Sequence, residues 1–303
     1  MAEALNLQNL RGELRLNEPM ARHVSWRAGG AAARAYFPAD GDDLAAFLRA
    51  ICSTEDLYFV GLGSNLLVRD GGVRATVVFT HWALRQISVL STGENTIAIY
   101  AEAGIASPKV ARFAALHGAE GAEFLAGIPG TVGGALAMNA GCYGGETWDL
   151  VDSVRTIDRH GVVRQRAARE FKIGYRSVVG AENEAFVAAT LRIACGDGEK
   201  SRQKIKQLLS KRIASQPLHQ PNAGSIFRNP PNDHAARLIE AGGLKGTRIG
   251  GAEISKKHAN FIVNLGGASA ADLEALIEHA QHTVREKFGV ELEREVRIIG
   301  ERV

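Results

Sequence analysis

The apolar positions of this chain alternate between two spacings. Spacing of three and four residues predicts helices, and runs rich in β-branched residues predict strands. The helical segments are residues 40–52, 107–118, 196–214, 233–241 and 269–289, with a further amphipathic helix candidate at the start of the chain. The predicted strands are 35–37, 57–60, 73–80, 96–103, 150–158, 162–166, 185–193, 261–265 and 290–299. Together they predict an α+β fold whose middle is largely antiparallel.

Several helix ends carry recognisable signals. Asp40 can cap the first helix, and Ser107 is expected to cap the second, with a proline in its first turn. Ser269 and Asp272 form a capping box, and Gly289 stops that helix. The final strand, 290–299, alternates apolar and charged residues and is expected to have one solvated face.

One stretch fits neither spacing. Residues 123–145 contain seven glycines and one proline with almost no charge, which predicts neither a surface linker nor a regular helix or strand. Glycine allows positive φ and lets backbone N–H groups form concave sites for phosphate, so a nucleotide diphosphate is a natural ligand. A tight turn packed against a sheet is the alternative.

Earlier in the chain, a first glycine loop, 61–65, follows a short strand. Its Gly-Leu-Gly-Ser-Asn sequence resembles the opening of a dinucleotide fingerprint, but the third glycine is missing and the next residues are strand-like. A standard Rossmann site is therefore disfavoured. The loop either brings its backbone to a phosphate, with Ser64 and Asn65 adding hydrogen bonds, or is an ordinary hairpin turn.

Composition narrows the class of protein. The 303 residues carry a net charge of +3 without a block of Lys or Arg that would indicate a nucleic-acid-binding arm, and an anionic small molecule explains the positive surplus equally well. Cys52, Cys142 and Cys195 are widely spaced and predict neither a disulfide framework nor a zinc site, and no other spacing indicates a metal. The absence of a signal peptide or a long apolar run predicts a cytoplasmic protein.

A polar stretch at 196–201 and a loop with four prolines at 216–231 place a boundary before a third domain. The predicted domains are residues 1–80, 81–195 and 196–303.

Six motifs follow one another along the chain: residues 61–65, 127–134, 138–141, 175–176, 223–230 and 292–296. In this order they resemble the motifs of the UDP-N-acetylenolpyruvoylglucosamine reductase family, in its shorter form. The resemblance implies an FAD-binding module of the vanillyl-alcohol-oxidase type in two subdomains, followed by a smaller α+β substrate domain. It also implies a monomeric, cytoplasmic oxidoreductase of peptidoglycan synthesis, needed for cell wall biogenesis, cell shape and cell division, with non-covalent FAD, NADPH as hydride donor and a UDP-sugar substrate.

The resemblance assigns roles to individual residues. Arg176, helped by Glu295, would stabilise negative charge on the substrate carboxylate, and Ser225 would protonate C2. The implied substrate contacts are Tyr175, Arg212, Arg228 and Asn229. The implied FAD contacts are Gly61, Leu62, Gly63, Ser64, Asn65, Leu66, Gly127, Ile128, Pro129, Gly130, Thr131, Gly133, Gly134, Asn139, Ala140 and Gly141.

This chain departs from the family pattern at three places. Val24–Arg27 replaces a threonine-rich turn, Cys142 stands where alanine is usual, and Arg228 where lysine is common. Two other functions fit the glycine loops: a flavin oxidase of another small alcohol or sugar, and a nucleotide-binding module without catalysis.

Overall fold

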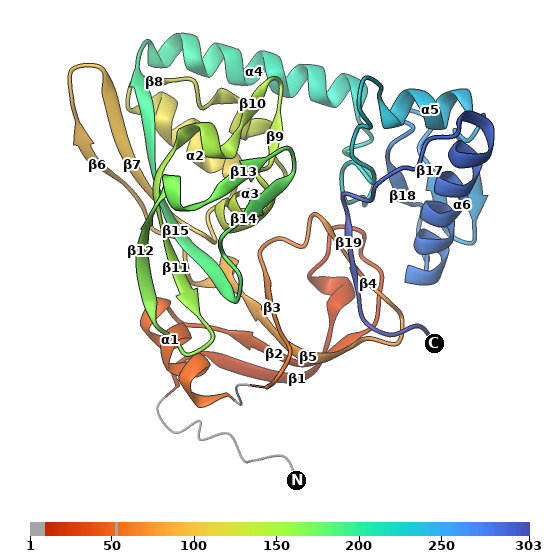
Figure 1. The fold of residues 1–303 in the computed structure, drawn as a ribbon, viewed down its shortest axis with the longest axis horizontal. Coiled ribbons are helices and arrows are strands. Elements are labelled where there is room, and N and C mark those ends of the chain that lie inside the picture. The colour runs from red at the N-terminus through yellow and green to blue at the C-terminus, as the bar shows by residue number, and fades with distance from the viewer. Residues whose placement is uncertain (1–9, 52–53) are drawn as a thin grey trace. The chain divides into compact units, whose positions relative to one another are not determined.

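The computed structural model describes residues 10–51 and 54–303 (Figure 1). The helix candidate at the start of the chain and Cys52 lie outside these residues. The chain divides into two compact units, each built from three segments. Unit 1 contains the described residues up to Arg15, then Arg34–Gly61 and Ala75–Ser210; unit 2 contains Leu16–Ala33, Leu62–Arg74 and Lys211–Val303. The predicted division into three consecutive domains stays a prediction.

Unit 1 contains a six-stranded antiparallel sheet, as the pattern predicted for the middle of the chain. Apolar side chains of the sheet, of α2 (Ser107–Leu116) and of α3 (Val132–Met138) form one core. The strands are, in sheet order, β12 (Val163–Ala167), β11 (Val151–Asp158), β15 (Glu184–Cys195), β7 (Thr96–Glu102) and β6 (Ile87–Thr92), with β8 (Ala119–Glu120) also pairing with β15.

A second sheet has four strands. Buried side chains of α1 (Gly41–Ala50) and of this sheet belong to the same hydrophobic core. The Asp40 side chain accepts a hydrogen bond from Asp43 N at 2.9 Å, which confirms the predicted cap. The ring of Phe47 stacks on Tyr36 with 3.7 Å between centroids. The strand order is β1 (Glu13–Pro19), β2 (Ala31–Phe37), β5 (Val73–Phe79) and β3 (Leu57–Val60).

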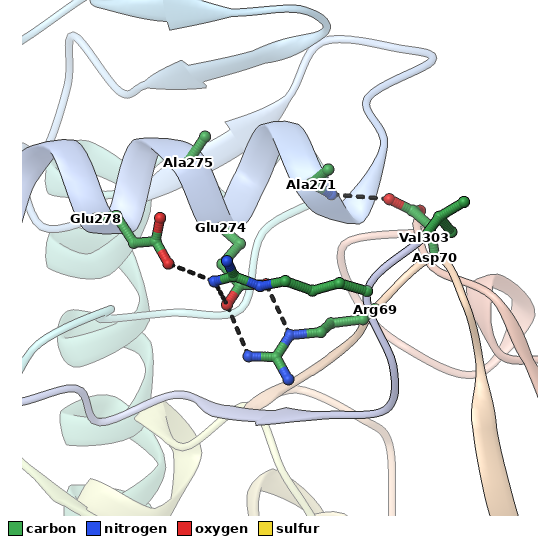
Figure 2. A pocket seen from close by; sticks show the side chains of 8 residues that line it. Arg69, Asp70, Ala271, Glu274, Ala275, Glu278 and Val303 are labelled. Atoms are coloured by element: carbon green, nitrogen blue, oxygen red, sulfur yellow. Dashed lines mark hydrogen bonds and ion pairs between the residues drawn. The ribbon is translucent and has the colours of Figure 1, made fainter.

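Unit 2 is organised around α6 (Ala270–Phe288), which has the predicted capping box and ends at Gly289 with φ +67°. Its buried face packs with α5 (Ala235–Ala241) and with a small antiparallel sheet. The Asp70 carboxylate accepts hydrogen bonds from Ala270 N and Ala271 N at the start of α6, both at 2.9 Å, and Figure 2 shows the one from Ala271. The strands of unit 2 are β16 (Arg248–Ile249), β17 (Ala252–Ile254) and β18 (Ile262–Asn264), and the parallel pair β4 (Leu66–Val68) and β19 (Arg297–Ile299).

The remaining elements are short, except for the charged helix before the proline-rich loop. They are α4 (Gly198–Ser215), β9 (Gly141–Cys142), β10 (Gly145–Glu146), β13 (Lys172–Gly174), β14 (Ser177–Val179) and the 3-10 helices Met20–Arg22, Thr80–Trp82, Glu123–Gly127, Thr147–Leu150 and Ala168–Glu170. Within residues 10–51 and 54–303, every helix is too short or too polar to cross a bilayer.

Three predictions were wrong in detail. The glycine-rich stretch contains a regular helix, α3, because Thr131 caps it and Val132, Ala135 and Leu136 are buried on one side. Ser107 does not cap α2; it is the first helical residue, and Ala106 holds the cap position. The final strand covers Arg297–Ile299 alone, because the preceding residues bond to an irregular loop instead of a neighbouring strand.

Candidate active site

The first glycine loop crosses from unit 1 to unit 2, and its unit 2 part is held against a turn at residues 23–25. Gly63 has φ +58°, and a Cβ there would lie 2.1 Å from the carbonyl oxygen of His23. Ser25 N donates to Gly63 O at 3.1 Å. Only glycine combines this φ with this close approach.

The same loop presents unused donors. In the part of the chain that the structure describes, the N–H groups of Leu62, Gly63 and Ser64 donate to no protein acceptor. Gly63 is buried, Ser64 is half-buried and Leu62 is exposed. Buried N–H groups are nearly always paired, so the unused donor of Gly63, with an unused donor on each side of it, favours a site for an anion.

The glycine-rich stretch 123–145, the second glycine run, lies in unit 1. Most of the backbone N–H groups around the start of its helix donate to acceptors within the protein. Val132 N donates to Ile105 O at 2.8 Å, and Gly133 N donates to Ala103 O at 2.9 Å. A Cβ at Gly133 would lie 2.8 Å from that of Ala103, so this glycine lets α3 pack closely on the end of β7. The start of α3 therefore has few donors left for a ligand.

The turn just before α3 is different. Among the described residues, the N–H groups of Gly130 and Thr131 donate to no acceptor, and Thr131 is buried. A Cβ at Gly61 would lie 2.3 Å from Thr131 Oγ1. The beginning of the first glycine loop thus lies directly against the second.

Arg176 lies in a two-residue turn between β13 and β14, with Tyr175 before it. Its backbone has φ +52°, an uncommon conformation for a residue with a long side chain. The guanidinium donates through Nη2 to Gly141 O at 2.7 Å and through Nη1 to Asn139 O at 3.3 Å, and its Cζ lies 5.0 Å from the centre of the Tyr175 ring. The predicted substrate residue is thus anchored to the end of the second glycine run.

Unit 2 brings the Ser225 loop next to the Glu295 segment. Glu295 N donates to Ile226 O at 2.7 Å, and Arg228 N donates to Glu293 O at 2.9 Å. The Asn65 side chain donates to Glu295 O at 3.1 Å. Ser225 and Glu295 therefore lie on neighbouring segments that Asn65 ties to the first glycine loop.

Asn260 braces the Ser225 loop and has no assigned role in the sequence interpretation. Its Nδ2 donates to Phe227 O at 2.8 Å, its Oδ1 accepts from Phe227 N at 3.0 Å, and its backbone O accepts from Ile226 N at 3.0 Å. The side chain is buried. Sequence could reveal this brace only as an asparagine beside a short strand, which is also typical of a turn.

The other predicted substrate residues have protein partners in unit 2. Arg228 Nη1 donates to Glu293 Oε1 at 3.0 Å, and Asn229 Oδ1 accepts from Ala235 N at 3.1 Å at the start of α5. Arg212 Nε donates to Gln216 Oε1 at 2.9 Å. Within residues 10–51 and 54–303, no cluster of three or more His, Cys, Asp or Glu could hold a metal ion. That Arg176, in unit 1, meets Ser225 and Glu295 stays a prediction.

Known proteins match both parts of the chain. Residues 32–165 match the family model described as an FAD binding domain, and residues 216–299 match the C-terminal domain of UDP-N-acetylenolpyruvoylglucosamine reductase. The UDP-N-acetylenolpyruvoylglucosamine reductase of Thiobacillus denitrificans is 56% identical over 97% of this chain and 94% of its own. The reductase of Methylococcus capsulatus is 58% identical over 96% of this chain and 94% of its own. This chain belongs to the UDP-N-acetylenolpyruvoylglucosamine reductase family.

A solved member of the reductase family has the same fold. The crystal structure of the enzyme from Thermus caldophilus superposes with a TM-score of 0.78 at 30% identity, over 95% of this chain and 99% of that chain. The predicted α+β fold, with a flavin-binding module and a C-terminal α+β domain, is confirmed. As a member of the reductase family with an FAD-binding domain, the protein is an FAD-dependent oxidoreductase.

Proposed function

We propose that this enzyme reduces UDP-N-acetylenolpyruvoylglucosamine to UDP-N-acetylmuramate, with NADPH as the hydride donor, in the cytoplasmic synthesis of peptidoglycan precursors. The observation that carries the proposal is the identity of more than half of all residues with reductases of this name, over nearly the whole of each chain. The cofactor is non-covalently bound FAD, and the protein acts as a monomer.

Each of the two glycine loops offers backbone donors of the kind that bind a diphosphate such as that of FAD. The N–H groups of Leu62, Gly63 and Ser64 form one set, and those of Gly130 and Thr131 form another. Both sets lie in polar, irregular backbone where a negative charge would complete the hydrogen bonding. The flavin supplies hydride transfer between NADPH and the enolpyruvyl double bond.

Arg176 has the chemistry that the substrate carboxylate requires. Hydride addition at the vinyl C3 builds negative charge at C2 and on the carboxylate attached to C2, and a fixed cation lowers the free energy of that state. A guanidinium binds a carboxylate with two parallel hydrogen bonds. The two backbone carbonyls that Arg176 contacts fix the direction of its planar group in advance.

Ser225 would give a proton to C2 of the substrate. A serine hydroxyl is a poor acid, so its proton must be replaced or its loss stabilised by a neighbour. Glu295, on the adjacent segment, is the proposed neighbour. Tyr175, Arg212, Arg228 and Asn229 would bind the UDP-sugar; Arg228 would exchange its partner Glu293, whose side chain is 70% exposed, for a phosphate oxygen.

The test follows flavin colour in the absence of oxygen. The purified protein should be yellow, bleach with NADPH and recover its colour when UDP-N-acetylenolpyruvoylglucosamine is added. If the substrate does not restore the colour, the proposal is wrong. Fast recovery with oxygen alone would favour an oxidase, and a colourless protein that FAD cannot reconstitute would favour a non-catalytic module.

The role of Ser225 has its own test. Ser225→Ala should bleach with NADPH at the normal rate and slow the recovery step by about 10²-fold or more, because protonation of C2 occurs in that step. Ser91→Ala, an exposed serine on β6, is the control and should change neither rate. Equal losses in both steps would refute the assigned role.

A further inference from the structure

Asn139 uses its whole side chain inside the protein. It ends α3 with φ +46° and is completely buried. Its Nδ2 donates to Glu146 Oε2 at 2.7 Å and to Gly174 O at 3.1 Å, while its Oδ1 accepts from Trp148 N at 3.1 Å. Both amide hydrogens are thus already engaged.

These contacts connect Asn139 with Arg176 in both directions. Gly174 is the last residue of β13 and directly precedes the Tyr175–Arg176 turn. The Asn139 side chain holds the carbonyl of Gly174, and Arg176 in return donates to the backbone carbonyl of Asn139. The two residues form a reciprocal latch between the end of α3 and the hairpin.

The hairpin needs such a latch. β13 and β14 pair over three residues each, and an isolated two-stranded hairpin is at best marginally stable in water. Most of its residues are exposed, including Ile173 at 37% and Val179 at 50%. Little apolar burial holds the turn, which also carries the positive φ of Arg176.

We propose that Asn139 is a positioning residue that fixes the Arg176 turn, and that its side chain does not contact FAD. The role of Arg176 toward the substrate rests on the proposed function, whereas the latch itself does not. In the enzyme, Asn139 acts on the substrate step through the hairpin and leaves the flavin-binding step to the backbone donors of the glycine loops.

Hydrogen exchange tests the latch without any activity. Asn139→Gly keeps the left-handed backbone, because glycine adopts positive φ freely, and removes only the side chain. Loss of its hydrogen bonds should speed amide exchange in residues 172–179 about tenfold. The control is Asn183→Gly, an exposed asparagine with φ +64° just before β15, which should leave that exchange unchanged. Equal exchange in Asn139→Gly and wild type would overturn the proposal.

The two half-reactions test the consequence. Asn139→Gly should slow recovery of flavin colour by UDP-N-acetylenolpyruvoylglucosamine at least about tenfold, since small misplacements of a binding group are costly. FAD affinity and bleaching by NADPH should stay within about twofold of wild type. The double variant Asn139→Gly/Arg176→Ala should recover its flavin colour no more slowly than Arg176→Ala alone, because both changes act on the same interaction with the substrate. A weaker FAD affinity with normal hairpin exchange would show that the side chain contacts FAD, and the proposal would fall.

A second pair of variants tests the latch if Asn139→Gly folds poorly. Asn139→Asp keeps the acceptor for Trp148 N but replaces both Nδ2 donors with an oxygen that faces the Glu146 carboxylate, so it should also loosen the hairpin. Adding Glu146→Gln supplies a donor at that contact and should restore part of the protection. No rescue would count against the latch. If the wild-type flavin is not reoxidised by the UDP-sugar, the proposed function fails, and the exchange result still decides the latch.

Discussion

Glu274 is a buried carboxylate that two arginines contact. Its side chain, 5% exposed on α6, accepts hydrogen bonds from Arg69 Nε and Nη2, both at 2.8 Å, and from Arg302 Nη2 at 2.9 Å (Figure 2). Arg69 Nη1 also donates to Gly300 O at 3.1 Å, just after β19. Arg69, Glu274 and Arg302 line an open pocket of about 260 Å³. The cluster fastens the end of the chain to α6 and to the residue that follows β4.

The magnitude follows from protonation. The hydrogen bonds from Arg69 and Arg302 lower the pKa of Glu274 from 4.5 to about 2. A carboxyl group with that difference between the unfolded and folded states contributes about 3 kcal/mol to the free energy of unfolding at neutral pH. Because the folded pKa is the lower one, this contribution is complete above pH 4.5 and is lost as the pH falls toward 2. About 1.4 kcal/mol should remain at pH 3.

Urea unfolding of Glu274→Gln at several pH values tests this reasoning. The variant should be about 3 kcal/mol less stable than wild type at pH 7, and the difference should roughly halve by pH 3. Circular dichroism and tryptophan fluorescence should give the same transition if the values are to be compared. Glu278→Gln, one turn further along the helix and 46% exposed, is the matched control and should cost less than about 1 kcal/mol. A cost below about 1 kcal/mol for Glu274→Gln at pH 7, or one that does not change with pH, would refute the argument.

Three further predictions concern the first glycine loop, the core of unit 2 and a half-buried histidine. Gly63→Ala should weaken FAD binding at least about tenfold in a fluorescence titration, because its Cβ would meet His23 O; unchanged affinity would mean that the loop is not part of the site. Asn264→Ala should lower the free energy of unfolding by about 2–3 kcal/mol, since its amide donates to Trp26 O at 2.9 Å and its oxygen accepts two backbone N–H groups; a loss under about 0.5 kcal/mol in urea would contradict this. Burial, with nearby Lys245, lowers the pKa of His258, so wild type should lose stability relative to His258→Gln as the pH falls below 6.5, and parallel pH profiles would disprove that.

The sequence predicted best those elements whose signals are local. The Asp40 cap, the capping box before α6 and the stop at Gly289 need only a few neighbouring residues to be recognised. Strands β6, β13 and β14 were missed because they are exposed and lack a clear alternation of buried and exposed residues. Tertiary context also decided the helical state of the glycine-rich stretch, since Gly133 is explained by Ala103, thirty residues earlier.

The candidate site also has features that local sequence signals predicted and features that only the tertiary structure reveals. The glycine loops were located correctly as unusual backbone, but no spacing could reveal which of their N–H groups stay unused. Nor could the sequence show that the side-chain amide of Asn139 donates to Gly174 and Glu146, or that Asn260 braces the Ser225 loop. Such facts depend on hydrogen bonds between residues far apart in the chain.

The way each unit gathers distant segments has a consequence for biosynthesis. Trp26 is completely buried in the core of unit 2, and its indole N–H donates to Ile262 O at 2.8 Å, across 236 positions. Because domains form from the residues already made, that early segment must leave the ribosome and remain without its apolar neighbours until nearly all of the chain has been translated. Ribosome-bound nascent chains stalled before residue 262 should therefore present this tryptophan to chaperones and proteases.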